Sequence, residues 1–182
     1  MIWLYAPSPA HAMVPATMSH DGRSDFDFYF GHWRVENRRL ARRLAGSTEW
    51  QHFEARQECR AILGGLGNLD TFSATTFIDG RPLEGMTLRL FDPATATWSI
   101  FWADDRSHVL QPPVVGRWTD GRGTFEGDDL FDGRPIRVRY TWTCGAQPTW
   151  QQAFSPDRGA TWETNWHMTM IRVDPPSESP SS

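Results

Sequence analysis

Apolar and polar residues alternate along most of this chain, and the alternation is most regular over residues 162–172. Large apolar side chains occupy every second position there, and polar side chains lie between them. The first set is Trp162, Trp166, Met168 and Met170, with Arg172 in the same phase, and the second is Glu163, Asn165, His167 and Thr169. A period of two residues predicts a half-buried β-strand with its apolar face turned inward. Arg172 therefore needs a partner for its charge.

The same alternation recurs upstream, interrupted by turn residues at short intervals. In four further segments, every second residue falls on one mostly apolar face. These faces are Trp33, Val35 and Asn37; Phe53, Ala55, Gln57 and Cys59; Met86, Leu88 and Leu90; and Trp98, Ile100 and Trp102. The Asp-Gly pairs at 120–121 and 132–133 are typical of hairpin turns.

About ten short strands joined by tight turns predict an antiparallel up-and-down meander. A sheet of this length leaves costly open edges unless it closes, so we predict one all-β barrel domain over residues 25–173. The aromatic and acidic segment 25–30 is expected to plug one end of the barrel. A β-sandwich is the alternative. Residues 1–24 and 174–182 are predicted to be a disordered arm and a disordered tail.

Length, charge and termini narrow the class of protein. The chain of 182 residues suits one domain, and its net charge of -4 offers no basic surface for nucleic acid or a membrane. Residues 1–12 end in Ala-His-Ala, as at a signal-peptidase site, but lack a positive segment. We therefore expect a cytoplasmic protein, with secretion as the alternative. Cys59 and Cys144 are expected to be reduced, buried thiols, with a disulfide as the alternative.

The stretch Gly31-His32-Trp33 lies just after the predicted plug. It resembles the Gly-x-Trp motif of the lipocalin (calycin) superfamily. The resemblance implies a lipocalin-like barrel in which this Trp closes one end and packs against an Arg of the last strand. Arg172 stands where that partner is expected, and a tryptophan face attracts a guanidinium by cation–π interaction. Gly31, Trp33 and Arg172 are therefore the predicted structural residues.

Residues 26–172 also resemble a family of bacterial lipocalin-like proteins, the DUF1579-like family. Three segments carry this resemblance: Leu-Gly-Gly-Leu-Gly-Asn at 63–68, Trp-Ala-Asp at 102–104 and Trp-Glu-Thr-Asn-Trp at 162–166. It implies the barrel fold and carries over no catalytic residue. Residues 155–162, Ser-Pro-Asp-Arg-Gly-Ala-Thr-Trp, resemble the Asp-box of sialidases, which implies a hairpin-stabilising turn.

The chain contains ten tryptophans, and rings of this size around a barrel mouth seldom pack without a gap. We therefore predict a tryptophan-lined cavity that binds a small apolar or aromatic molecule. A fully packed core is the alternative. The predicted ligand-binding residues are Trp33, Asn37, Gln57, Trp102, Tyr140, Trp142, Trp150, Gln152, Trp162, Thr164 and Trp166.

Three other functions stay open. Asp104, His108 and Asn37 are the candidate acid–base residues if the barrel is an enzyme, such as an isomerase, a cyclase or a hydrolase. A homodimeric interaction module would use exposed rings as its interface. His167 on the last strand resembles the haem ligand of the nitrobindins, although its phase predicts an outward side chain. Apart from haem, no cofactor is expected, and the spacing of the histidines predicts no metal site.

Overall fold

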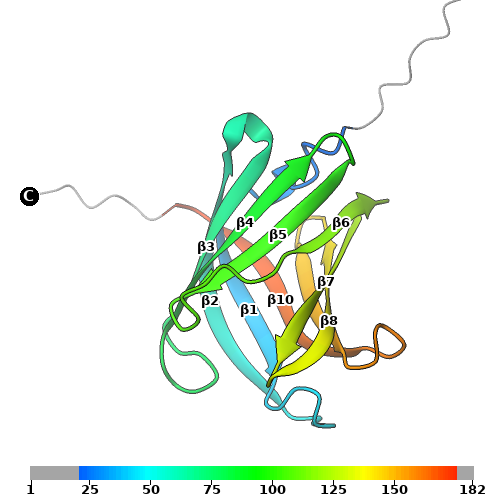
Figure 1. The fold of residues 1–182 in the computed structure, drawn as a ribbon. Coiled ribbons are helices and arrows are strands. Elements are labelled where there is room, and N and C mark those ends of the chain that lie inside the picture. The colour runs from blue at the N-terminus through cyan, green and yellow to red at the C-terminus, as the bar shows by residue number, and fades with distance from the viewer. Residues whose placement is uncertain (1–20, 176–182) are drawn as a thin grey trace, which may run out of the picture.

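Ten antiparallel strands close into a barrel in the computed structural model, which describes residues 21–175 (Figure 1). Each strand pairs with the next along the chain, and the last pairs with the first. The strands are β1 (Gly31–Leu40), β2 (Trp50–Ile62), β3 (Gly67–Ala74), β4 (Leu83–Asp92), β5 (Thr97–Asp104), β6 (Val114–Thr119), β7 (Arg122–Phe131), β8 (Arg134–Thr143), β9 (Thr149–Ser155) and β10 (Glu163–Val173). The predicted all-β, up-and-down, lipocalin-like barrel is confirmed, and the β-sandwich alternative is wrong.

Helix is nearly absent from residues 21–175. Two short 3₁₀ turns are present there, η1 (Asp27–Tyr29) before β1 and η2 (Leu63–Gly65) between β2 and β3. Neither has the length or the apolar character that crossing a membrane requires. Of the predicted arm and tail, residues 1–20 and 176–182 lie outside the described residues.

The turn at residues 21–26 leads into η1 and is fastened to the barrel. The indole N–H of Trp98 donates to the carbonyl oxygen of Gly22 at 3.2 Å. Gly22 has φ of +81°, and a Cβ there would lie 2.7 Å from the ring of Phe91. Only glycine tolerates both this backbone angle and so close a ring. Gly22 therefore allows the turn to pack against the barrel next to the plug.

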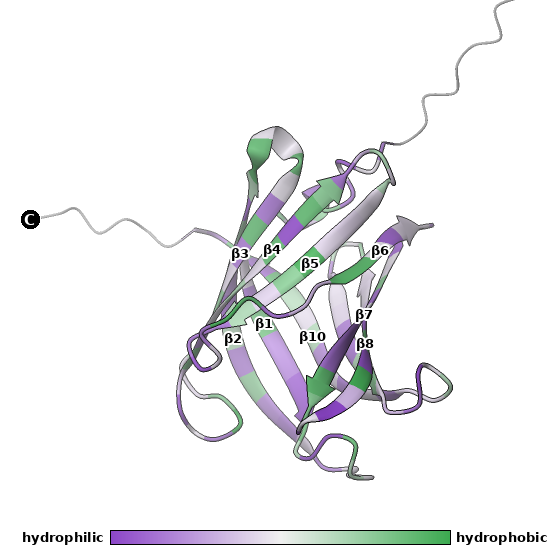
Figure 2. Ribbon diagram, in the orientation of Figure 1, coloured by the Kyte–Doolittle hydropathy of each residue, from purple (hydrophilic) through white to green (hydrophobic). Residues whose placement is uncertain are grey.

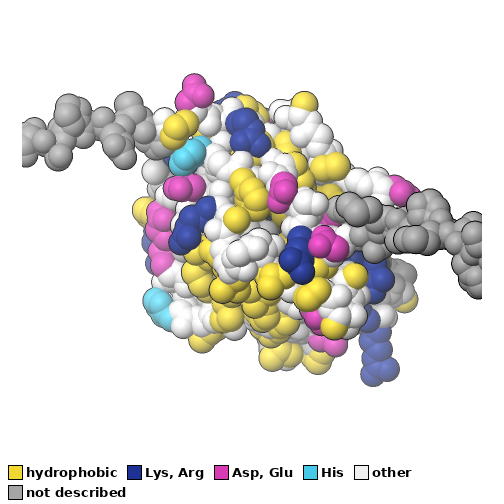
Figure 3. Space-filling view, turned by 90° about the horizontal axis from the view of Figure 1, so that it is seen from above, with side chains coloured by type: hydrophobic (Ala, Val, Ile, Leu, Met, Phe, Trp, Pro, Cys, Tyr) yellow, Lys and Arg dark blue, Asp and Glu magenta, His cyan; other side chains and the backbone are white. Residues whose placement is uncertain are grey.

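Phe26, just before η1, and Tyr29, its last residue, plug one end of the barrel and are fully buried. The ring of Phe26 meets that of Trp98 edge to face at 5.0 Å, and Tyr29 stacks on Trp33 at 5.5 Å. Full burial of such a side chain contributes about 1.5–3 kcal/mol relative to exposure. Seen from this end, side chains fill the barrel, with apolar groups among scattered charged ones (Figure 3). The predicted plug therefore forms the closed end.

Arg172 of β10 lies directly opposite Trp33 of β1. Its guanidinium carbon is 4.2 Å from the centre of the Trp33 ring, and its two Nη groups donate to the carbonyl oxygens of Phe30 and Phe28 at 2.8 Å each. The expected contact with Trp33 is thus observed, but the expected burial of Arg172 is wrong, because its side chain reaches out over the plug and stays exposed. A Cβ on Gly31, whose φ is +111°, would lie 2.8 Å from Arg172 Nη1.

Hydrophilic and hydrophobic residues alternate along the strands, as Figure 2 shows. On β1, β2 and β5 the predicted faces point inward and are largely buried. On β4 the apolar face formed by Met86, Leu88 and Leu90 points outward, and the inner face carries Thr87 and Arg89. The apolar pattern alone therefore predicts the wrong inner face for β4. Arg89 can face inward because its charge has a buried partner.

That partner is Asp70 on β3, and both side chains are almost completely buried. Arg89 Nη1 lies 2.5 Å from Asp70 Oδ2 and also donates to Asn68 Oδ1 at 2.9 Å. Gln57 donates to Asp70 at 3.3 Å and accepts a hydrogen bond of 2.6 Å from the hydroxyl of Tyr29. The polar chain therefore connects the plug to the walls formed by β2, β3 and β4.

Burial raises the pKa of the Asp70 carboxyl. Burial also opposes the charge on Arg89, but the attraction of Asp70 raises the pKa of the guanidinium above its ordinary value. An arginine keeps its proton at such pKa values, so the two groups form an ion pair.

Replacing Arg89 with methionine should lower the free energy of unfolding by about 3–5 kcal/mol, because Asp70 would remain buried without its counter-charge. Urea unfolding followed by tryptophan fluorescence measures this loss. Arg56→Met, on the exposed outer face of β2, is the matched control and should change stability by less than about 0.5 kcal/mol. The double variant Asp70→Asn/Arg89→Met should recover part of the loss. An Arg89→Met variant as stable as the Arg56→Met control would contradict the role of the pair.

β10 contains a β-bulge at Asn165. Thr164 lies opposite Ala153 and Trp166 opposite Gln152, so Asn165 is the extra residue. It is fully buried, and its Oδ1 accepts a hydrogen bond of 2.9 Å from Gln152 Nε2. The bulge shifts the alternation by one residue, which moves the earlier part of the strand to the other face.

The bulge corrects three sequence-based placements. Asn165 is buried rather than outward, and Thr164 shares the outer face with Ala153. Trp162 lies outside the barrel, where the guanidinium carbon of Arg139 is 3.7 Å from the centre of its ring. The predicted inward positions of Trp162 and Thr164 are therefore wrong.

The turn between β9 and β10 is closed by its own side chains, as the Asp-box resemblance implies. Asp157 Oδ1 accepts hydrogen bonds from the Ser155 hydroxyl at 2.7 Å and the Thr161 N–H at 2.8 Å. Its Oδ2 accepts one from the Thr161 hydroxyl at 2.6 Å. The hydroxyl and the N–H of Thr161, followed by Ser155, lower the pKa of Asp157 to about 2. The ionised carboxylate therefore stabilises the hairpin.

This hairpin predicts a pH-dependent loss of stability. Because the pKa of Asp157 falls from 3.8 to about 2 on folding, its contribution is present above pH 3.8 and disappears as the pH falls towards 2. Asp157→Asn should therefore lower the melting temperature at pH 6, and the difference from wild type should narrow as the pH is lowered to 3. Asp120→Asn, in the turn between β6 and β7, is the control. A difference that stays constant with pH would refute this role.

The two cysteines are free, as predicted. Cys59 is buried on the inner face of β2, whereas Cys144 is exposed, so the expected burial of Cys144 is wrong. Burial raises the pKa of Cys59 to about 12, so its side chain is a thiol at neutral pH.

Candidate ligand-binding cavity

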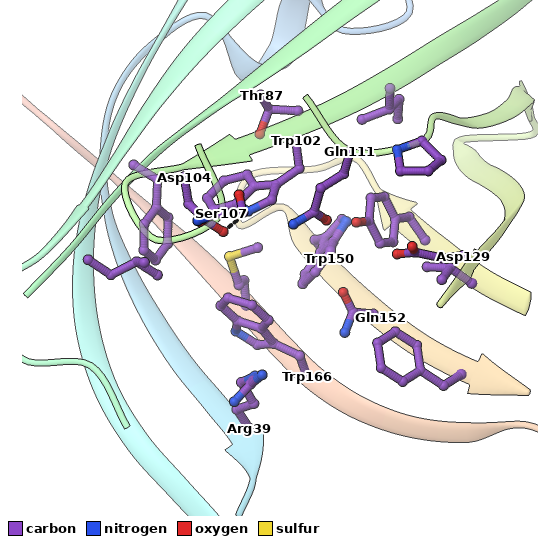
Figure 4. A pocket seen from close by; sticks show the side chains of 18 of the residues that line it. Arg39, Thr87, Trp102, Asp104, Ser107, Gln111, Asp129, Trp150, Gln152 and Trp166 are labelled. Carbon is purple, nitrogen blue, oxygen red and sulfur yellow. Dashed lines mark hydrogen bonds between the residues drawn. The ribbon is translucent and has the colours of Figure 1, made fainter. Parts of the chain in front are cut away.

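A cavity of about 560 Å³ lies inside the barrel (Figure 4). It extends from the buried polar side chains around Arg89 to the loops at the end opposite the plug. Several predicted ligand-binding residues line it: Gln57, Trp102, Tyr140, Trp142, Trp150, Gln152 and Trp166. They come from β2, β5, β8, β9 and β10. The structure thus brings together residues that lie more than 100 positions apart in sequence.

Four predicted ligand-binding residues do not line this cavity. Trp33 belongs to the closed end, and Trp162 and Thr164 lie outside the barrel. Asn37 is buried in the wall, where its Oδ1 accepts a hydrogen bond of 3.0 Å from Trp166 Nε1. Asn37 therefore orients a lining ring instead of contacting the cavity.

The lining rings meet edge to face. Trp150 and Trp166 are 5.7 Å apart with an interplanar angle of 84°, and Tyr140 and Trp150 are 5.0 Å apart at 62°. Phe72 meets Trp166 at 6.4 Å and 86°. Such pairs are favourable and hold each ring at a definite angle. The wall therefore has a defined aromatic surface.

Asp104 lies at the end of β5 and closes the following loop. Its Oδ2 accepts a hydrogen bond from Trp102 Nε1 at 2.8 Å, and its Oδ1 accepts the N–H groups of Arg106 and Ser107 at 3.1 and 2.7 Å. Burial opposes ionisation, but the hydrogen bonds from Ser107 and Trp102 outweigh it and lower the pKa of Asp104. Its carboxylate thus orients Trp102 and the loop.

The candidate acid–base residues do not come together. Asp104 lines the cavity, His108 is exposed with φ of +55° and does not line it, and Asn37 is within the wall. No shared site is formed in which a proton could pass between these three groups. The structure therefore gives the enzyme alternative no supporting geometry from these residues.

Three arginines near the open end were not predicted as site residues. Arg106 pairs with Asp79 at 3.0 Å, and Arg43 lies over Phe131, 4.5 Å from its ring centre. Arg39 is 7% exposed and lies beside the ring of Trp166 (Figure 4). Arg39 continues the inward phase of Trp33, Val35 and Asn37, so the alternation itself contained the signal.

Apolar side chains surround the opening of the cavity. Val109 and Leu110 in the loop after β5, and Leu130 near the end of β7, line the cavity and are 59%, 50% and 65% exposed. Side chains that are both exposed and part of the lining show that the cavity reaches solvent here. A homodimer that uses exposed apolar groups stays a prediction.

His167, the residue that suggested haem, lies on the outer face of β10. Its ring centre is 5.3 Å from that of Trp50, and Arg38 is opposite it on β1. Burial, followed by the charge of Arg38, lowers the pKa of His167. Within residues 21–175, no histidine lines the cavity, and no group of three or more His, Cys, Asp or Glu side chains could hold a metal ion. The placement of His167 does not fit a haem ligand in this cavity.

The three segments that resemble the DUF1579-like family lie at separate places in the barrel. Residues 63–68 form η2 and enter β3, residues 102–104 end β5, and residues 162–166 carry the bulge of β10. Membership of that family stays a prediction, and any function has to be proposed from the cavity itself. No protein-family model matches the chain, and no curated protein matches it either.

Proposed function

We propose that the protein binds a small, largely apolar or aromatic molecule in the barrel cavity. The observation that carries this proposal is an open volume of about 560 Å³ with tryptophan rings from four strands around it. Ligand sites typically occupy about 300–1,000 Å³ and combine apolar walls with a few polar groups. Here the polar groups include Thr87, Gln111 and Gln152.

The wall is preorganised for an apolar ligand because the indole N–H groups of two of its rings are hydrogen-bonded within the protein. Trp166 donates to Asn37 within the wall, and Trp102 donates to Asp104 at the end of β5. The ring of Trp102 also lies over Gly85, where a Cβ would collide with it. These rings therefore present carbon surface to the cavity and are held back from filling it.

A neutral fluorescent probe tests this function. N-phenyl-1-naphthylamine, whose emission rises in apolar surroundings, should bind saturably with one site per chain. Val138→Trp places an indole on an inward position of β8 that lines the cavity, and it should weaken probe binding at least about tenfold. The loss follows because the added ring occupies the space of the probe. A fluorescence titration measures both affinities.

Val115→Trp adds the same ring on the exposed face of β6 and is the control. It should bind the probe as wild type does. Melting curves show whether each variant is folded before titration. Failure of the wild-type protein to bind the probe, or equal weakening by the two variants, would refute the proposed site. Native mass spectrometry of protein from its own host then identifies any molecule that it carries.

A further inference from the structure

Arg39 is a charged group of the cavity lining that is buried and has no ion-pair partner among the described residues. Its side chain is 7% exposed, and its Nε is buried without an acceptor. Within residues 21–175 its guanidinium forms no ion pair and no hydrogen bond. Buried arginines are normally paired, because an isolated buried charge is costly. Arg89, by contrast, forms an ion pair with Asp70.

Aromatic rings satisfy only part of what Arg39 requires. The guanidinium carbon lies 5.3 Å from the ring centre of Phe77 and 5.2 Å from that of Trp166. Cation–π contacts act on the faces of a guanidinium, whereas its N–H groups point outward in its plane. The edge of Arg39 therefore lacks acceptors even with both rings in place.

The charges that act on Arg39 make the lack of an anion more pronounced. Burial, followed by the positive charges of Arg43 and Arg106, lowers the pKa of Arg39 to about 9. Nearby carboxylates have other partners: Asp79 pairs with Arg106, and Asp104 accepts three N–H groups. Two further acids, Asp129 and Glu163, accept the N–H groups of Leu130 and Leu44 at 2.7 Å each.

Three other residues that line the cavity carry a buried polar atom without a hydrogen-bond partner. Arg89 Nε, Trp142 Nε1 and the Ser107 hydroxyl are buried without a hydrogen-bond partner. Two of these groups are donors only, and the third can donate. These three atoms have almost no accessible surface, so a ligand in the cavity would not reach them, whereas the two Nη groups of Arg39 are not buried in this way.

From these contacts we propose that the bound molecule is an organic carboxylate, with its carboxylate on Arg39 and its apolar body against Trp150 and Trp166. This inference rests on the proposed function and specifies the chemistry of its ligand. A guanidinium presents a planar fork that matches a carboxylate with two parallel hydrogen bonds. The buried guanidinium of Arg39 supplies one positive charge, which fits one carboxylate, and the aromatic wall fits an apolar remainder.

The test compares two ligands of the same shape, one with an anionic carboxylate and the other with a neutral amide. 2-Naphthoate and 2-naphthamide share one ring system, and each is used to displace N-phenyl-1-naphthylamine from the wild-type protein at neutral pH. The carboxylate should bind at least about tenfold more tightly than the amide, because it alone offers Arg39 a negative charge. This comparison needs no variant.

Arg39→Met and Arg38→Met then locate the preference. They remove the same charge from neighbouring residues, but Arg38 lies on the outer face, 5.1 Å from the ring centre of Trp50. Arg39→Met should bind both naphthalenes about equally. Arg38→Met should keep the wild-type preference for the carboxylate. Arg39→Lys, which keeps the charge but not the fork, should fall between wild type and Arg39→Met.

Stability provides a second readout. If Arg39 serves a ligand, Arg39→Met should melt at the same or a higher temperature than wild type without ligand, since an unpaired buried charge is removed. Equal affinity of the wild-type protein for the acid and the amide, or a preference that survives in Arg39→Met, would overturn the inference and leave the proposed function standing. A protein that binds neither the neutral probe nor the naphthoate would overturn both.

Discussion

The ion pair between Arg89 and Asp70 is the interaction on which the closed half of the barrel depends. Two opposite charges with almost no exposure are tolerable only where each finds the other and the remaining donors and acceptors are largely matched. Asn68 accepts a hydrogen bond from Arg89, and Gln57 donates one to Asp70. Gln57 also accepts a hydrogen bond from the hydroxyl of Tyr29 in the plug. The same group of side chains therefore anchors the plug, joins three strands and forms the floor of the cavity.

The barrel contains two buried arginines in opposite situations. Arg89 is surrounded by rings of the plug and has a carboxylate at 2.5 Å. Arg39 has rings on its faces but no anion at its edge. Because the desolvation of a charge is costly in both places, the difference in pairing separates a structural role from a binding role. The location agrees with this division, since Arg89 is near the closed end and Arg39 near the open one.

The cavity persists because the polar groups of its wall hold the rings in place. Trp166 is tied to Asn37, Trp102 to Asp104, and the bulge at Asn165 sets which side of β10 faces inward. Without the bulge, Trp162 would share the inner face with Trp166, and the space between the strands would be more crowded. Side chains that do not touch the cavity thus define its shape.

The strands, their antiparallel order and the inner faces of β1, β2 and β5 follow from the sequence, because alternation with a period of two and tight turns are local properties. Gly31, Trp33 and Arg172 were also found as a set, through the resemblance of residues 31–33 to the lipocalin motif. The face of β4 could not be found this way, because only the fold shows that Asp70 lies beside Arg89. The bulge at Asn165 is likewise decided by pairing with β9, and that pairing displaced Trp162 and Thr164 from the predicted site. Whether a buried charge has a partner depends on contacts between distant segments, so the isolation of Arg39 is a property of the tertiary structure alone.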